Sequence, residues 1–125
     1  MKKIINTKNA PAAIGPYSQA TVFNNTLYVS GQLPIDPGSG EICGTDVKAQ
    51  TKLVMQNLLA IVEAAGAKAE NILKCTILLT NMADFVAMNE VYGSFFPNDP
   101  PARICYQVTA LPKGAIVEID AIVAL

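Results

Sequence analysis

Histidine is absent from the 125-residue sequence. Its absence excludes the Ser-His-Asp triad, the Cys-His pair, imidazole acid–base catalysis and every metal site that needs a histidine ligand. Arginine is nearly absent too, since Arg103 is the only arginine among nine basic residues. An enzyme with this sequence must therefore work with carboxylates, arginine, tyrosine, lysine, hydroxyls, thiols and backbone groups.

Charge is also scarce. Charged residues make up 15% of the chain, hydrophobic residues make up 51%, and the net charge is −1. No basic cluster is longer than Lys2-Lys3, so the basic surface that nucleic-acid binding requires is missing. The high apolar content suggests that part of the outer surface is covered by another chain.

No apolar run approaches the roughly 18 residues of a membrane span, and the first residues lack the apolar core of a signal peptide. The three cysteines, Cys43, Cys75 and Cys105, are odd in number and far apart. They predict a reduced, cytoplasmic protein with free thiols and cannot form a zinc site on their own. We expect no metal, pyridoxal or nucleotide cofactor, because the glycines at 38–40 also lack the lysine of a phosphate loop.

The first half of the chain predicts an edge strand over 1–6, a proline-containing loop over 9–16 and a hairpin. The hairpin strands are 19–23 and 26–30, on either side of Asn24-Asn25, a pair that tolerates the positive φ of a tight turn. Apolar residues at helical spacing then predict a helix over 46–65. Thr45 or Asp46 can cap its start and Gly66 can end it.

The second half predicts a strand over 73–80, a helix over 82–96 capped by Asn81 with Asp84 reaching back, and strands over 102–108 and 115–124. We interpret L-P-K-G, between the last two strands, as a hairpin turn. No linker or repeat interrupts the chain, so residues 1–125 are expected to form one α+β domain whose two helices cover one face of the sheet.

The last strand is apolar on both sides. Ala115, Val117, Ile119, Ala121 and Val123 alternate with a second set that contains Ile116 and Ile122. Strands of this kind are normally buried on both faces. Because no third helix is available, the second face is expected to pack against other copies of the chain.

If the last two strands form a hairpin, residues whose numbers sum to about 225 are paired. Glu118 then faces Gln107, with Cys105 diagonal to it and Arg103 one step further. Residue types alone leave several interpretations open. Arg103 and Glu118 are either a structural ion pair or a reactive pair, Cys105 is either a small buried apolar group or a site residue, and Tyr17 either covers the core or lines a site.

Five motifs resemble one family, and they occur in the family's order along nearly the whole chain. The motifs are N-A-P-A-A-I-G-P-Y-S-Q-A (9–20), V-S-G-Q-L-P-I-D-P-G-S-G-E (29–41), D-F-V-A-M-N (84–89), P-A-R-I-C (101–105) and L-P-K-G-A-I-V-E-I-D-A (111–121). The sequence thus resembles the RidA/YjgF family of reactive-intermediate deaminases. Three positions depart from the usual pattern: Ile104 stands in place of Ser, and Gln107 and Asp120 each stand in place of Glu.

The resemblance implies a chorismate-mutase-like homotrimer with clefts between subunits. It also implies hydrolysis of 2-enamine and 2-imine acids, such as 2-aminoacrylate and 2-aminocrotonate, to 2-keto acids and ammonia. By the same resemblance Arg103 binds the substrate carboxylate and Glu118 holds or activates water, with Tyr17 as the third catalytic residue. Ser30, Gly31, Asn89 and Cys105 are expected to line the cleft.

Two other functions stay open at this stage. One is a non-catalytic trimer that binds small carboxylic acids, for which Arg103 would serve equally well. The other is a ribonuclease or translation inhibitor, a label that the family has carried. The net charge, the lack of a basic stripe and the absence of histidine count against the ribonuclease.

Overall fold

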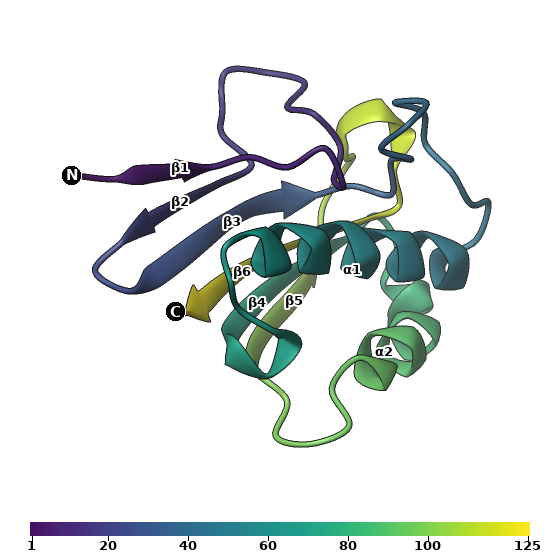
Figure 1. Ribbon diagram of the computed structural model, residues 1–125. Helices are drawn as coiled ribbons and strands as arrows, with labels where there is room; N and C mark the ends of the chain where they lie inside the picture. The colour runs from purple at the N-terminus through teal and green to yellow at the C-terminus, as the bar shows by residue number, and fades with distance from the viewer.

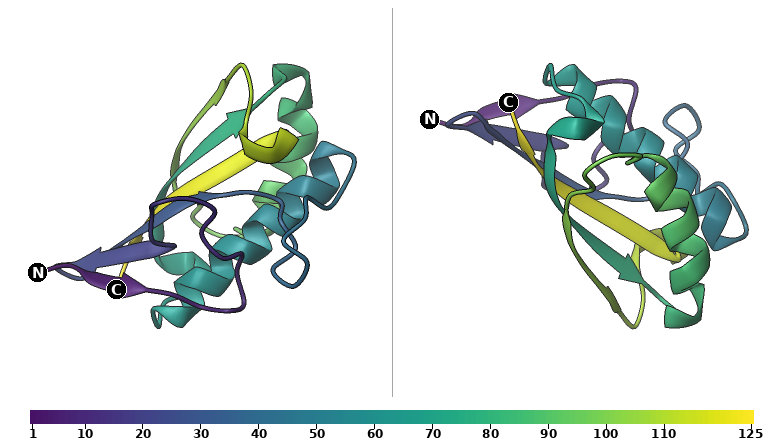
Figure 2. Two further views of the ribbon diagram at one scale, coloured as in Figure 1. Left: turned by 90° about the horizontal axis from the view of Figure 1, so that it is seen from above. Right: turned by 90° about the horizontal axis from the view of Figure 1, so that it is seen from below.

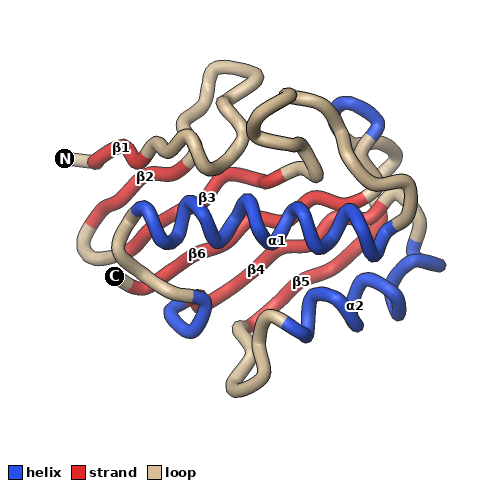
Figure 3. Tube along the Cα trace, turned by 45° about the vertical axis from the view of Figure 1, so that its right-hand side comes forward, coloured by secondary structure: helices blue, strands red, loops and turns tan.

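The computed structural model describes residues 1–125 and contains six strands and two α-helices. In chain order these are β1 (Lys3–Ile5), β2 (Ala20–Phe23), β3 (Thr26–Gln32), α1 (Val47–Ala64), β4 (Ile72–Leu79), α2 (Phe85–Ser94), β5 (Ala102–Gln107) and β6 (Val117–Ala124). The strands form one sheet in the order β1-β2-β3-β6-β4-β5, and both helices lie on the same face of it (Figures 1 and 3). The predicted α+β class, with two helices on one face, is confirmed.

The N-terminal hairpin forms as predicted. β2 and β3 pair antiparallel around Asn24 and Asn25, whose φ angles are 49° and 60°. Asparagine occupies this left-handed region more readily than most residues, because its short polar side chain bonds locally. β1 pairs with β2 at the edge of the sheet, so the predicted edge strand is also confirmed.

α1 is the longer helix and carries most of the core. Asp46 caps it, with Oδ1 accepting the Ala49 N–H at 2.8 Å, and Gly66 follows its end with φ +88°. Val54, Leu58 and Ile61 are fully buried on one side of the helix. Figure 3 shows α1 crossing the face of β3, β6 and β4, so this apolar side packs on the middle of the sheet.

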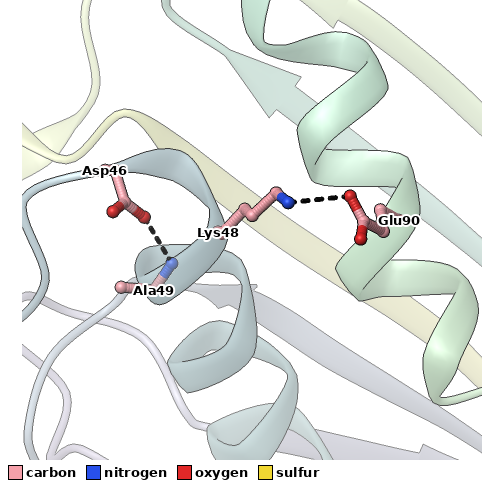
Figure 4. A network of polar contacts seen from close by, with 4 residues as sticks. All are labelled: Asp46, Lys48, Ala49 and Glu90. Atoms are coloured by element: carbon pink, nitrogen blue, oxygen red, sulfur yellow. Dashed lines mark hydrogen bonds and ion pairs between the residues drawn. The ribbon is translucent and has the colours of Figure 1, made fainter.

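α2 is shorter than predicted, because its first turn is a separate 3₁₀ turn, Met82–Asp84. Asn81 caps this turn by accepting the Ala83 N–H, and Asp84 makes no side-chain cap bond. A Lys48–Glu90 ion pair of 2.8 Å links α1 to α2 (Figure 4). Both side chains are exposed, so solvent screens the pair and it adds little to stability. No helix is long and apolar enough to cross a membrane.

The predicted hairpin of the last two strands is wrong. β5 pairs with β4 in parallel, and β6 lies between β3 and β4, antiparallel to both. β4, α2 and β5 form a β-α-β unit, in which a helix returns the chain to the start of a parallel neighbour. The L-P-K-G segment instead forms a 3₁₀ turn with Lys113 at φ 59°. Because β4 separates β5 from β6, Glu118 pairs with Leu78 rather than with Gln107.

The two faces of the sheet differ sharply (Figure 2). On the helix face, Val117, Ile119 and Val123 of β6 are completely buried. The opposite face, which we call the open face, carries no helix, and its Tyr28, Ile104 and Tyr106 are each about half exposed. The alternation predicted for the last strand is therefore present. Its second side lies on a broad apolar surface of the kind that normally contacts another chain.

Candidate functional site

One group of candidate residues surrounds Arg103, which lies on β5 and points to the helix face. We call Phe85, Asn89, Tyr92 and Arg103 the arginine cluster. The Nη1 group of Arg103 donates a hydrogen bond to Asn89 Oδ1 at 2.6 Å. The guanidinium carbon lies 5.5 Å from the ring centre of Phe85 and 5.2 Å from that of Tyr92. Cation–ring contacts of this kind are each worth roughly 0.5–2 kcal/mol, so the side chain is held from several sides.

Cys105 follows Arg103 on the same face of β5 and is half-buried against the core. Burial raises the pKa of its thiol, and the nearby Arg103 opposes that rise. Gln107 sits further along the same face, and its Oε1 accepts the Met82 N–H at 2.8 Å. The glutamine therefore fixes the turn that begins α2, a role that its position in a strand pattern did not reveal.

A second group comes from the loop before β2, from the last residues of β3 and from β6. We call Tyr17, Ser30, Gly31 and Glu118 the carboxylate cluster. They share a cavity of about 280 Å³ with Ile14, Leu33 and Pro112. The volume suits a small ligand rather than a drug-sized one. Four of the seven predicted site residues are thus brought together by the fold.

Gly31 is required by the position of Glu118. A Cβ atom built at residue 31 would lie 2.1 Å from Oε2 of Glu118, far inside contact distance. The pairing of β3 with β6 shifts between Val29 and Gln32, so the strand bulges at this point. The bulge and the missing side chain together make room for the carboxylate at the sheet surface.

Glu118 is half-buried, and its pKa is raised. Burial is the main cause, because it penalises the charged form, and the neighbouring Asp120 carboxylate adds to the rise. Asp120 lies two residues along β6 on the same face, where its Oδ1 accepts the Thr76 N–H at 2.9 Å. A carboxyl group with a raised pKa can exchange protons with a substrate nearer to neutral pH.

Tyr17 and Ser30 are fixed by backbone groups. The Tyr17 hydroxyl oxygen accepts the Ile14 N–H at 3.1 Å, which leaves its own O–H free to donate. The Ser30 hydroxyl donates to the Ser18 carbonyl at 2.6 Å, which leaves its oxygen free to accept. The carboxylate cluster therefore offers a donor, an acceptor and a proton-exchanging acid around one small cavity.

Buried amide side chains hold the loops that build this cavity. Asn57 of α1 donates to the carbonyls of Leu33 and Ile35 at 3.1 and 2.8 Å. Gln50, two turns earlier on the same side of α1, accepts the Ile116 N–H and donates to the Gly44 carbonyl, each at 3.0 Å. Because unsatisfied buried polar groups are costly, these bonds fix the loops on α1. Sequence reasoning missed both residues, although polar side chains on the apolar side of a helix were visible.

The two clusters lie on opposite faces of the sheet. Arg103 pairs with Cys75, which is buried beneath the helices, whereas Glu118 pairs with Leu78 on the open face. Directly paired residues share a face, so Arg103 and Glu118 do not meet within one chain. The prediction of one arginine–thiol–carboxylate patch within a hairpin is wrong, because it depended on the incorrect register of β5 and β6.

Residues 7–125 match the sequence family described as Endoribonuclease L-PSP. A Mus musculus protein named 2-iminobutanoate/2-iminopropanoate deaminase is 48% identical over 122 residues, which are 98% of this chain and 90% of that protein. The crystal structure of a Rid-family protein, YyfA from Yersinia pestis, is 45% identical, has a TM-score of 0.97 and matches over the whole of both chains.

A structure described as E. coli TdcF with bound serine is 44% identical, with a TM-score of 0.94 over 98% of each chain. Sequence and backbone therefore agree along nearly the whole chain, as the five motifs predicted. The protein belongs to the Rid/YjgF family, whose sequence family carries the description Endoribonuclease L-PSP.

Proposed function

We propose that this protein hydrolyses small 2-enamine and 2-imine acids, such as 2-aminoacrylate and 2-aminocrotonate, to 2-keto acids and ammonia. The observation that carries the proposal is the match to proteins named 2-iminobutanoate/2-iminopropanoate deaminase, which covers nearly the whole chain. The site chemistry supports it. A lone guanidinium suits a carboxylate. The small cavity on the other face of the sheet holds an acid with a raised pKa.

The working unit in this proposal is a homotrimer with three clefts between subunits. Arg103 lies on an edge strand and Glu118 on the open face, so one chain holds them on opposite sides of its sheet. A second copy packed on the apolar open face can bring its own Arg103 cluster to the carboxylate cluster of the first. Each cleft then takes the arginine from one subunit and Tyr17, Ser30, Gly31 and Glu118 from another.

The reaction requires little machinery, because the imine carbon is already electrophilic. Arg103 holds the substrate carboxylate, and Glu118 takes a proton from water as the water oxygen bonds to C2. Glu118 then passes that proton to the nitrogen, which gives a carbinolamine. Transfer of the hydroxyl proton to the same nitrogen lets the C–N bond break, so that ammonia leaves as the keto group forms. Tyr17 donates its free O–H to the intermediate, and Ser30 and Asn89 line the cleft with Cys105.

The direct test couples a threonine dehydratase to this protein and follows disappearance of the imine. Catalytic amounts of the wild-type protein are expected to accelerate the loss well beyond the spontaneous rate. Val86→Ala is the matched control and should accelerate the loss of the imine as much as the wild type does, since Val86 is an exposed side chain on α2 outside both clusters. An unchanged imine lifetime at stoichiometric protein would rule out the deaminase.

A second candidate function is a trimeric binder of small carboxylic acids without turnover. The related structure described with bound serine favours it, since serine carries the same carboxylate as the proposed substrates. Binding of 2-oxobutanoate without imine hydrolysis would identify this function. The ribonuclease named in the family description has less support here, because the chain has a net charge of −1 and no histidine.

We place the reaction in the cytoplasm and assign it no cofactor. Cys43, Cys75 and Cys105 are all unpaired, which suits a reducing compartment. No three His, Cys, Asp or Glu side chains gather as metal ligands would. Full activity of protein dialysed against a chelator is the expected result, and restoration of lost activity by a metal ion would contradict the proposal.

A further inference from the structure

One side of α2 faces β5, and three residues along it contact Arg103. Phe85, Asn89 and Tyr92 are four and then three residues apart, so they form a single stripe along the helix. All three contact the guanidinium of Arg103. One stripe of α2, which includes two aromatic rings, therefore contacts the only arginine in the chain.

The guanidinium lies at a similar distance from each of the two rings. Residues seven apart in an α-helix are separated by about 10.5 Å along the axis. The guanidinium carbon lies 5.5 Å from one ring centre and 5.2 Å from the other, distances that a position between two rings with this spacing allows. Asn89 lies between the two rings in sequence and takes one hydrogen of Nη1.

Tyr92 contributes its ring rather than its hydroxyl. The residue is only 4% exposed, and its hydroxyl lies against the buried Cys75 thiol and makes no hydrogen bond to Arg103. The ring is therefore the part of Tyr92 that contacts the guanidinium. The ring also packs on Phe96, with centroids 5.0 Å apart, so its position beneath the guanidinium is fixed from behind.

We propose that Phe85 and Tyr92 are positioning residues that set the plane of the Arg103 guanidinium for a bidentate carboxylate. Asn89 occupies one donor of the fork and directs the remaining N–H groups toward the ligand. Without the rings the charge would remain but the orientation of the fork would be lost. The inference rests on the proposed function, because it assigns a purpose to the carboxylate-binding half of that site.

The test compares Phe85→Leu with Phe85→Tyr and uses 2-oxobutanoate as the binding probe in calorimetry. Loss of one ring is expected to weaken binding and lower kcat/KM by about tenfold. Phe85→Tyr keeps a ring and should restore both values. Phe95→Leu is the matched control, since Phe95 is also half-buried at the end of α2 but has no cation over it.

A double-mutant comparison separates orientation from general stability. In an Arg103→Lys background the planar fork is gone, so Phe85→Leu should cause little further loss of binding. Equal losses in the two backgrounds would overturn the positioning role. Binding by the wild type without imine turnover would reject the proposed function alone, whereas a wild type that binds no 2-oxobutanoate would reject the positioning role as well.

A spectroscopic measurement needs no variant and so does not depend on how Phe85→Leu folds. Because the chain has one arginine, the ¹⁵N signals of its guanidinium are unambiguous. A fork held between two rings and bonded to Asn89 should show slow rotation and separate Nη signals. A single averaged Nη signal at low temperature would contradict the proposal.

Discussion

The arginine cluster and the carboxylate cluster are held by different means. Arg103 is held by side chains, namely two rings and an amide from one helix. The carboxylate cluster is shaped by backbone, through a strand bulge, a glycine and loops fixed on the amides of α1. The first can be changed by replacing side chains while the fold is kept. The second depends on the course of the chain itself.

This difference predicts which residues act on chemistry and which on binding. The guanidinium is permanently charged and exchanges no proton, so in the proposed reaction we expect it to hold a ligand. Glu118 has a raised pKa and lies in the cavity, so we expect it to transfer a proton. The two halves are therefore expected to respond differently to substitution.

Glu118→Gln should have the largest effect. Glutamine keeps the size of the side chain and loses the ability to exchange a proton, so kcat is expected to fall about 10²–10⁴-fold. Binding of 2-oxobutanoate should change little, because Arg103 is untouched. Coupled dehydratase assays and calorimetry on the same preparation measure both quantities. A parallel fall of rate and affinity would make Glu118 a structural residue instead.

Arg103→Lys should have a smaller effect on a different quantity. Lysine keeps the charge but lacks the planar fork, so kcat/KM and 2-oxobutanoate affinity should both fall about 10–100-fold. Sedimentation should still show a trimer. Near-normal turnover would remove the carboxylate-clamp role, and dissociation with normal activity in the remaining trimer would make Arg103 an interface residue.

Mixing the two defective variants tests whether a site is shared between subunits. After unfolding and refolding Arg103→Lys together with Glu118→Gln in equal amounts, about a quarter of the clefts should combine an intact arginine with an intact glutamate. Activity should therefore recover to about a quarter of the wild-type value. Activity no higher than the mean of the two pure variants would place both residues in one subunit's site.

Asp120→Asn should shift the pH profile while leaving the site complete. Asparagine can still accept the Thr76 N–H, but it removes the charge that adds to the raised pKa of Glu118. Glu118 must be ionised to accept a proton from water, so activity falls as the pH drops through its raised pKa. The acid limb of kcat/KM should therefore move to lower pH in Asp120→Asn. A shift to higher pH would contradict this interaction.

The smallest expected difference concerns the thiols. Cys43 is exposed, whereas Cys75 is completely buried on the helix face, where burial raises its pKa to about 11. A thiol reagent at neutral pH should therefore label Cys43 quickly and leave Cys75 unmodified until the protein unfolds, because the thiolate is the reactive form. Mass spectrometry after brief labelling identifies the modified residues. Rapid labelling of Cys75 would show that α2 opens away from the sheet.

The sequence predicted elements well and their pairing less well. Helix α1, the N-terminal hairpin and the alternation of β6 follow from local patterns, and each formed as expected. The partner of β5 does not follow from local patterns. The signal that could have placed it was the succession of strand, helix and strand over 73–108, which favours a parallel pair. We instead predicted an antiparallel hairpin of the last two strands, because L-P-K-G between them resembles a hairpin turn.

The candidate site shows the same limit. Motifs identified the four residues of the carboxylate cluster and Arg103 and Asn89 of the arginine cluster, because residue types and their order are enough for a family resemblance. Phe85 and Tyr92, which complete the arginine cluster, were not among the predicted site residues. The motifs did not reveal that Arg103 and Glu118 face opposite ways, since a facing direction depends on strand register. The support from Gln50 and Asn57 was missed for another reason. Each buried amide forms hydrogen bonds with loops that are distant in sequence. Helical spacing predicts which side of a helix is buried, but it does not predict which loops contact that side.

The position of β6 has a consequence for how the protein is made. β6 is the last strand in chain order, yet it lies between β3 and β4 near the middle of the sheet. Until residues 117–124 leave the ribosome, β1-β2-β3 and β4-β5 have no strand to join them. Each then presents an unpaired edge, which is a template for aggregation. Folding of the sheet is therefore a late event in synthesis, and a chain that stops before β6 leaves two fragments of a sheet instead of a shortened domain.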